Sequence, residues 1–187
     1  VEAFCDCSSL SSIIISNSVK TIGSRAFYNC TSLDSIDIPN SVTAIGGGAF
    51  EETGIYKNES NWENDVLYIG DCLIEAKSSI SDRYTIKNGT RLIAGGAFNL
   101  SDSLSSIIIP NSVTCIGGGA FEKTGIYKNK SNWEDNVLYI SNCLIEAHTI
   151  ESNTYSIKEN TRVIADDAFN INGYITSITI PKSVTHI

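Results

Sequence analysis

Apolar and polar residues follow a repeating order along this chain. An Ala-Phe pair recurs six times, at intervals of 23, 23, 48, 23 and 48 residues, at 3–4, 26–27, 49–50, 97–98, 120–121 and 168–169. Each short interval contains one phrase, of which LDSIDIPNSVTAIGGGAF at 33–50 is typical. A fixed period of this length indicates stacked coils that bury their apolar residues against one another.

Within the phrase, the spacing of the apolar residues predicts a short strand. Leu33, Ile36 and Ile38 stand three and two residues apart, which is the leucine-rich repeat pattern. The two isoleucines face inward and the residue between them faces outward. The proline that follows in three copies ends the strand, because it cannot donate a backbone hydrogen bond. We therefore expect a repeat solenoid with a curved parallel β-sheet and short turns or 3-10 segments on its convex side.

The Ala-Phe pair closes each coil, and its phenylalanine is a large apolar side chain at a constant place in the repeat. Such side chains are usually buried rather than offered to a ligand. We expect an aromatic column inside the convex side, formed by Phe27, Phe50, Phe98, Phe121 and Phe169.

Two long units, at about 50–97 and 121–168, carry an additional segment. Residues 46–76 and 117–147 differ at only six of 31 positions, so this segment is a duplicated structural element. Its centre, DVLYIGDCLIEA at 65–76 and NVLYISNCLIEA at 136–147, has two apolar runs separated by two turn residues. That pattern predicts a β-hairpin. Residues 1–187 are thus predicted to form one leucine-rich-repeat domain of 23-residue coils with two hairpin inserts.

The recurring string IPNSVTxIGGGAF resembles the BspA-like, or Treponema pallidum type, leucine-rich repeats. These repeats occur on surface proteins of oral and gut bacteria and of some parasitic protists. The Pro, Ser-Val-Thr, Ile-Gly and Ala-Phe elements recur in register over essentially the whole chain, although Ser16 replaces the usual proline. The resemblance implies an extracellular or cell-surface location, and some members of the family bind host matrix proteins or aggregate bacteria.

Both ends of the chain cut through a coil. The first coil starts at its Ala-Phe pair and the last one stops at SVTHI. Arrays of this kind shield their terminal coils with polar caps, and neither end has such a cap. We therefore expect a fragment of a longer array, whose open end coils favour end-to-end self-association.

Charge and hydropathy exclude several classes of partner. The formal net charge is -8, whereas nucleic acids and anionic membranes require clustered Lys and Arg. No apolar run is long enough to insert into a membrane. We expect neither nucleic-acid binding nor membrane insertion of this fragment.

The six cysteines do not form a disulfide framework. Only Cys7 and Cys30, at equivalent positions one coil apart, are placed for a bond, and the favoured alternative is two buried free thiols. No Cys-x-x-Cys motif and no Cys/His cluster is present, so we predict no metal site and no cofactor.

Residues suited to catalysis are not repeated between the duplicated units. His148 is replaced by Lys77 in the other unit, and His186 by Cys115. Neither histidine is expected to be an organised base. We predict no catalytic residue and no enzymatic activity, because an active site needs converging groups in a pocket.

Two surfaces are candidates for binding. The strand face offers small, mostly neutral outward residues, among them Ile14, Asp37, Thr85, Ile108, Ser156 and Thr179. The inserts are richer in the aromatic residues that anchor interfaces, with Tyr56 and Trp62 in one copy and Tyr127 and Trp133 in the other. The alternative for each tryptophan is that it packs over its own hairpin.

These observations favour a non-enzymatic adhesion or protein-binding module whose ligand is a host matrix protein or another surface protein. A structural spacer that projects another domain is the first alternative. Glycan binding through the insert tryptophans is the second. Exposure discriminates between them, since a protein-binding face requires a continuous mixed strip and a spacer requires buried tryptophans.

Overall fold

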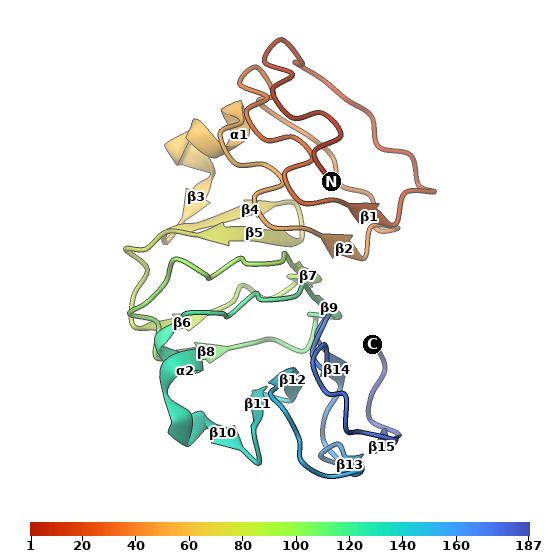
Figure 1. The fold of residues 1–187 in the computed structure, drawn as a ribbon. Helices are drawn as coiled ribbons and strands as arrows, with labels where there is room; N and C mark the ends of the chain where they lie inside the picture. The colour runs from red at the N-terminus through yellow and green to blue at the C-terminus, as the bar shows by residue number, and fades with distance from the viewer.

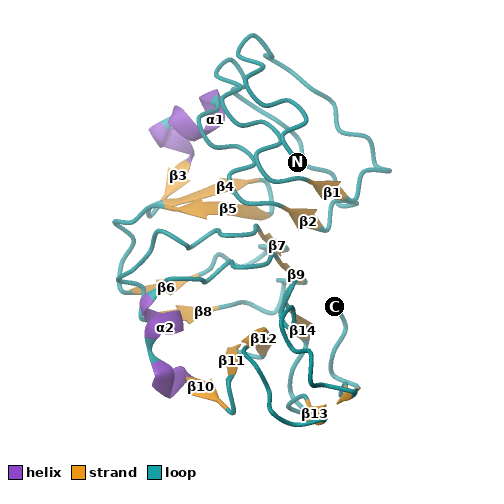
Figure 2. Cartoon of the chain, viewed as in Figure 1, coloured by secondary structure: helices purple, strands orange, loops and turns teal.

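The computed structural model describes residues 1–187 and shows a chain wound into a stack of coils. The N-terminal coils lie at one end of the stack and the C-terminal coils at the other (Figure 1). Most of each coil is turn or loop, and helix occurs only in the two inserts (Figure 2). The predicted repeat solenoid is therefore confirmed.

Short parallel ladders join neighbouring coils at two places. The first is the predicted strand face, where β6 (Arg83–Thr85) pairs with β8 (Ser106–Ile108) and β13 (Thr154–Ser156) with β15 (Ser177–Thr179). The second lies at the two residues that end in the Ile before each Gly or Ala, a segment that the sequence indicated only as a return path. Its strands are β1 (Thr21–Ile22), β2 (Ala44–Ile45), β7 (Leu92–Ile93), β9 (Cys115–Ile116) and β14 (Val163–Ile164).

Each insert is larger than the predicted hairpin. Insert 1 consists of α1 (Gly54–Lys57), η1 (Glu59–Asn61), β3 (Trp62–Glu63), β4 (Val66–Ile69) and β5 (Cys72–Ala76). Insert 2 repeats it as α2 (Gly125–Lys128), η2 (Lys130–Asn132), β10 (Trp133–Glu134), β11 (Val137–Ile140) and β12 (Cys143–Ala147). The hairpin itself is confirmed, since β4 pairs with β5 and β11 with β12 in antiparallel register.

Local turn chemistry explains the additional parts of the insert. The buried Thr53 caps α1 by accepting a hydrogen bond from the backbone N–H of Tyr56 at 3.1 Å. Asn64 and Asp65 both have positive φ, which is the two-residue turn that connects β3 to β4. The last strand then runs parallel to the next coil, with Cys72 opposite Leu92. Each insert is thereby joined to the solenoid by backbone hydrogen bonds.

The predicted continuous sheet is instead divided into short ladders. Residues 12–16 and 35–38 run along the strand face but form no strand and no backbone hydrogen bond with each other. A parallel ladder needs two extended segments side by side. Insert 1 lies between 35–38 and β6 in the chain, and these two segments do not pair. Insert 2 separates β8 from β13 in the same way.

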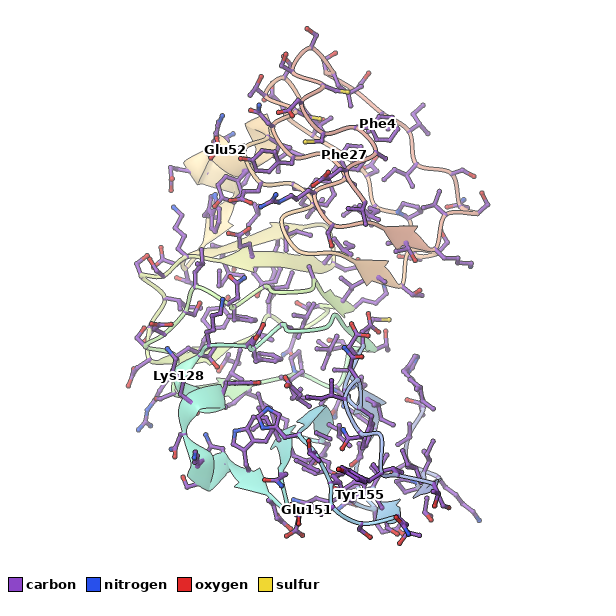
Figure 3. The ribbon with its side chains drawn as sticks, in the orientation of Figure 1. Phe4, Phe27, Glu52, Lys128, Glu151 and Tyr155 are labelled. Atoms are coloured by element: carbon purple, nitrogen blue, oxygen red, sulfur yellow. The ribbon has the colours of Figure 1, made fainter.

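The phenylalanine column is interrupted at the same places. Phe4, Phe27 and Phe50 stack at ring-centroid distances of 5.3 and 5.5 Å, and Phe98 stacks on Phe121 at 5.2 Å. Figure 3 shows the first two of these rings together near the N-terminal end. Between the two stacks, the backbone N–H of Ala76 donates to the carbonyl of Ala97, as that of Phe27 donates to Ala49. The insert strand thus takes the place of a coil, and the predicted single column was wrong there.

At the C-terminal end, Phe169 is half-buried and packs edge-on against Tyr155 at 6.0 Å. The core contacts of its coil are made within a separate cluster of buried residues that includes Val137, Leu144 and Ile157. Of the other two buried clusters, one contains Phe27 and Phe50 and the other contains Phe98 and Phe121.

Two arginines connect the coils across the inserts, a role that the sequence did not suggest. Arg91 donates to the carbonyl of Val42 at 2.6 Å and pairs with Asp71 at 3.0 Å. Arg162, its duplicate, donates to the carbonyls of Val113 and Pro110. Each guanidinium therefore connects the coil before an insert to the coil after it.

None of the helices has the length and apolar character needed to span a membrane.

In the Gly runs at 46–48 and 117–119, the first glycine is required by the close approach of coils. A Cβ on Gly117 would lie 2.3 Å from the backbone N of Gly95, and one on Gly46 would lie 2.4 Å from that of Ser24. We expect Gly117→Ala to lower the free energy of unfolding by about 2–4 kcal/mol, since backbone must move to admit the methyl group. Urea unfolding followed by circular dichroism measures this loss. Gly173→Ala is the matched control, because a Cβ there meets nothing within 4 Å; equal stabilities of the two variants would contradict the prediction.

Candidate functional site

The outward residues of the strand face are exposed. Ile14 is 97% exposed and Ile108 is 58% exposed, which is unusual for large apolar side chains. The other predicted members of this row are also exposed: Asp37, Thr85, Ser156 and Thr179. Side chains between inward isoleucines thus point to solvent, as the alternation predicted.

Backbone pairing brings some of these outward residues together. Thr85 lies opposite Ile108, and Ser156 lies opposite Thr179, in the parallel registers of the two ladders. In the N-terminal coils, Ile14 and Asp37 line one hollow of about 240 Å³ together with Pro39. The row is therefore a mixed apolar and polar strip in three sections, whereas a continuous strip was expected.

The tryptophan of insert 1 is half-buried and fixed in place. Its indole Nε1–H donates to the carbonyl of Tyr56 at 2.8 Å, and the two rings meet edge to face at 5.1 Å. The ammonium of Lys77 lies 4.6 Å above the Trp62 ring and pairs with Glu59. Packing of the tryptophan within its own insert is therefore part of its role, as the alternative interpretation held.

Insert 2 has the same frame with different side chains around it. Trp133 donates to the carbonyl of Tyr127 at 2.8 Å and meets its ring at 5.1 Å. Here His148 stacks on Trp133 with ring centroids 4.1 Å apart, and its Nε2 lies 3.1 Å from the Tyr127 hydroxyl. The hydroxyl of Tyr127 donates to Glu146 Oε1 at 2.9 Å.

The sequence predicts that His148 is not an organised base, because Lys77 takes its place in the other unit. The structure places it in an organised network with Tyr127, Glu146 and Trp133, and its Nε2 lies 3.3 Å from Glu146 Oε1. Burial, followed by the hydrogen bond to Glu146, raises the pKa of Tyr127 well above its ordinary range, so its hydroxyl remains a donor. No sequence signal identified this network, because Tyr127 stands 19 residues from Glu146 and 21 from His148.

The inserts are on the same flank of the stack. Figure 3 labels Glu52 beside insert 1 and Lys128 on insert 2, and both lie along one edge of the molecule. Strands β6 and β8 lie between the two inserts along the stack (Figure 1).

A second pair of equivalent hollows lies at the base of the inserts. Glu75 and Glu51 line one of about 270 Å³, and their counterparts Glu146 and Glu122 line another of about 360 Å³. Burial, and then the charge of Glu51, raises the pKa of Glu75 to about 7, while the hydrogen bond from the Tyr56 hydroxyl acts in the opposite direction.

The six cysteines are free thiols. Cys30 is buried and donates to the carbonyl of Phe4 at 3.1 Å, whereas Cys7 is exposed. Cys72 and Cys143 are fully buried in the inserts, and burial raises the pKa of their thiols to about 12 and about 11. Burial and the raised pKa make both unreactive, since the thiolate is the nucleophile.

The repeat and its ladders agree with the comparisons with known proteins. The BspA type leucine-rich repeat region matches this chain in six copies, over residues 1–124 and 69–187. The chain belongs to this family. Members of a repeat family stack their units into an extended surface, which suits binding better than catalysis. No curated protein matches the chain.

Among solved structures, this BspA-type array is similar to a leucine-rich cell surface protein from Faecalibacterium prausnitzii A2-165. The two are 22% identical, and the match covers 90% of this chain and 60% of that one with a TM-score of 0.30. The array thus spans about 60% of the length of that protein. We assign the family from the repeat match alone.

The raised pKa of Glu75 makes the stability of the array pH-dependent. The native state binds this proton more tightly than the unfolded state, whose pKa is near 4.5, so stability is lost as pH rises from about 4.5 to 7. Glu75→Gln keeps an acceptor for Tyr56 and removes the titration. We expect the variant to be more stable than the wild type by about 1–3 kcal/mol at pH 8, and by much less at pH 4.5.

Urea unfolding of both proteins from pH 4 to 8 measures this difference. Glu51→Gln serves as the companion variant, because it removes a charge that raises the pKa of Glu75 and so moves the transition to lower pH. A difference between wild type and Glu75→Gln that stays constant with pH would contradict the assignment.

Proposed function

We propose that this BspA-type array is a non-enzymatic cell-surface module that holds a protein ligand along its strand face. The observation that carries the proposal is the row of exposed outward residues with two solvent-facing isoleucines, Ile14 and Ile108. Solvent-exposed side chains of this size become favourable contacts when a partner covers them, at about 25 cal/mol per Å² of apolar area.

The chemistry of the strip fits a protein partner. Its side chains are apolar, hydroxyl-bearing or, at Asp37, acidic, and no basic cluster accompanies them. Interfaces of non-obligate complexes have this mixed composition, with an apolar centre and a polar rim. A host matrix protein or another surface protein remains the partner we propose, and the extracellular location follows from the same proposal.

Side-chain exposure on the strand face and in the inserts favours binding over a spacer role. A spacer gains nothing from a large exposed isoleucine, which adds a liability for aggregation. Both tryptophans are half-buried rather than fully buried, and polar side chains surround them. These features support a binding module in which the strand face makes the main contact.

Substitutions on the strip test the proposal. We expect Ile14→Asp and Ile108→Asp each to weaken binding at least tenfold, or by about 1.4 kcal/mol, because an aspartate cannot be buried against an apolar partner without cost. Biolayer interferometry against a panel of purified matrix proteins, including fibronectin and collagen, measures the affinity. Thermal unfolding should show unchanged stability, since both side chains are solvent-exposed in the free protein.

Thr21→Asp is the control variant, because Thr21 is exposed on the other ladder, away from the strip. It should bind like the wild type. If both isoleucine variants keep wild-type affinity, the strand face is not the binding surface. If the wild type binds no member of the panel, the spacer role gains support.

A further inference from the structure

The two inserts share one frame but surround their tryptophans differently. Six of 31 positions distinguish 46–76 from 117–147, and one of them places Lys130 where insert 1 has Glu59. Just beyond these ranges, His148 stands where insert 1 has Lys77. These two changes concern a single contact in the structure.

In insert 1 this contact is an ion pair. The Lys77 ammonium bonds the Glu59 carboxylate and lies 4.6 Å above the Trp62 ring. In insert 2 the counterparts are a lysine and a histidine, which cannot form that pair. Lys130 makes no ion pair, and His148 turns to Tyr127 and Glu146 instead.

The space between these counterparts is open in insert 2. A hollow of about 560 Å³ is lined by aromatic residues, Tyr127, Trp133 and His148, and by polar residues, Lys128, Lys130, Asp135 and Asn136. Lys130 and His148 both line it, so the Lys77–Glu59 pair crosses the corresponding place in insert 1. The size of the hollow is in the range of small-ligand sites.

The charge of the two inserts also differs. Residues 51–77 contain seven acidic and two basic side chains, a net charge of -5, whereas 122–148 contain four acidic and three basic ones, a net charge of -1. Within a protein of net charge -8, insert 2 is therefore the less repulsive place for an anion.

We propose that the hollow of insert 2 is a binding site for a carboxylated sugar residue, a uronic or a sialic acid, and that insert 1 is closed to it by the Lys77–Glu59 pair. This site does not use the strand face, so it stands apart from the protein-binding function proposed above.

The lining residues match this ligand group by group. The unpaired ammonium of Lys130 supplies a charge-assisted hydrogen bond to one carboxylate. Asp135, which makes no ion pair, offers acceptors for hydroxyl groups. The aromatic residues that line the hollow supply apolar surface for the C–H face of a sugar ring, and Tyr127 and Trp133 are held rigid by their own hydrogen bonds.

A more highly charged group fits less well. Phosphate is best recognised by bidentate arginine or by several converging donors, and the hollow contains no arginine. Lys128, the other lysine that lines the hollow, is paired with Asp102 at 3.0 Å. One free ammonium beside one free carboxylate suits a single negative charge accompanied by hydroxyls.

The two tryptophans allow each insert to be observed separately. They are the only tryptophans of the protein, so a ¹H–¹⁵N spectrum contains one indole N–H signal from each insert, assigned with Trp62→Phe. Methyl β-D-glucuronide and the methyl glycoside of N-acetylneuraminic acid are titrated separately. We expect at least one of them to shift the Trp133 signal saturably, with Kd on the order of 1 mM, and to leave the Trp62 signal in place.

Charge-exchange variants test the closing pair. Lys130→Glu restores the acidic residue of insert 1 and should weaken binding at least tenfold. The reciprocal variant, Glu59→Lys with Lys77→His, should open insert 1, so that the Trp62 signal also responds. Thermal unfolding checks that each variant is folded.

Each result has a defined consequence. The acid that binds more tightly identifies the class of sugar. An equal shift of the Trp133 signal by methyl β-D-glucoside or by acetate would overturn the proposal, because the site would then not recognise a carboxylated sugar ring. No shift of Trp133 up to about fifty times the expected Kd, or an unchanged affinity of Lys130→Glu, would overturn it as well. None of these results depends on whether the array binds a matrix protein.

Discussion

Close stacking of one coil on the next is the constraint on which the rest of this structure depends. The backbone N–H of Gly46 donates to the carbonyl of Ile22, and that of Gly117 donates to Ile93. These contacts require glycine, since a Cβ would collide with the neighbouring backbone. The Ile-Gly element of the repeat therefore permits the short distance between coils. The stacked phenylalanine rings fill the interior of these coils.

The inserts satisfy the same constraint by substitution. Each brings a strand of its own that pairs with the following coil, and that coil carries an arginine that donates to backbone carbonyls of the preceding coil. Hydrogen bonds therefore continue from coil to coil although the array is interrupted twice. The cost is a divided sheet and a divided aromatic column.

Duplication gives the protein two copies of one frame with different chemistry. The turn, the cap and the Tyr–Trp contact are the same in both, down to the 5.1 Å ring distance. The side chains around the tryptophan are free to change because they face solvent, and an ion pair in insert 1 becomes an open polar hollow in insert 2. The residues that hold each insert together are thus shared by the two copies, whereas the residues around the hollow differ.

The sequence by itself determined the solenoid, the inward and outward alternation and the hairpins, because each depends on local periodicity or turn residues. The exposure of Ile14 and Ile108 followed directly from that alternation. Only the tertiary structure decided that the inserts divide the sheet, that Arg91 reaches Val42 and that His148 stacks on Trp133. These contacts join residues 15 to 49 positions apart, and which residues meet is fixed by how the coils and inserts stack rather than by any repeat in the chain.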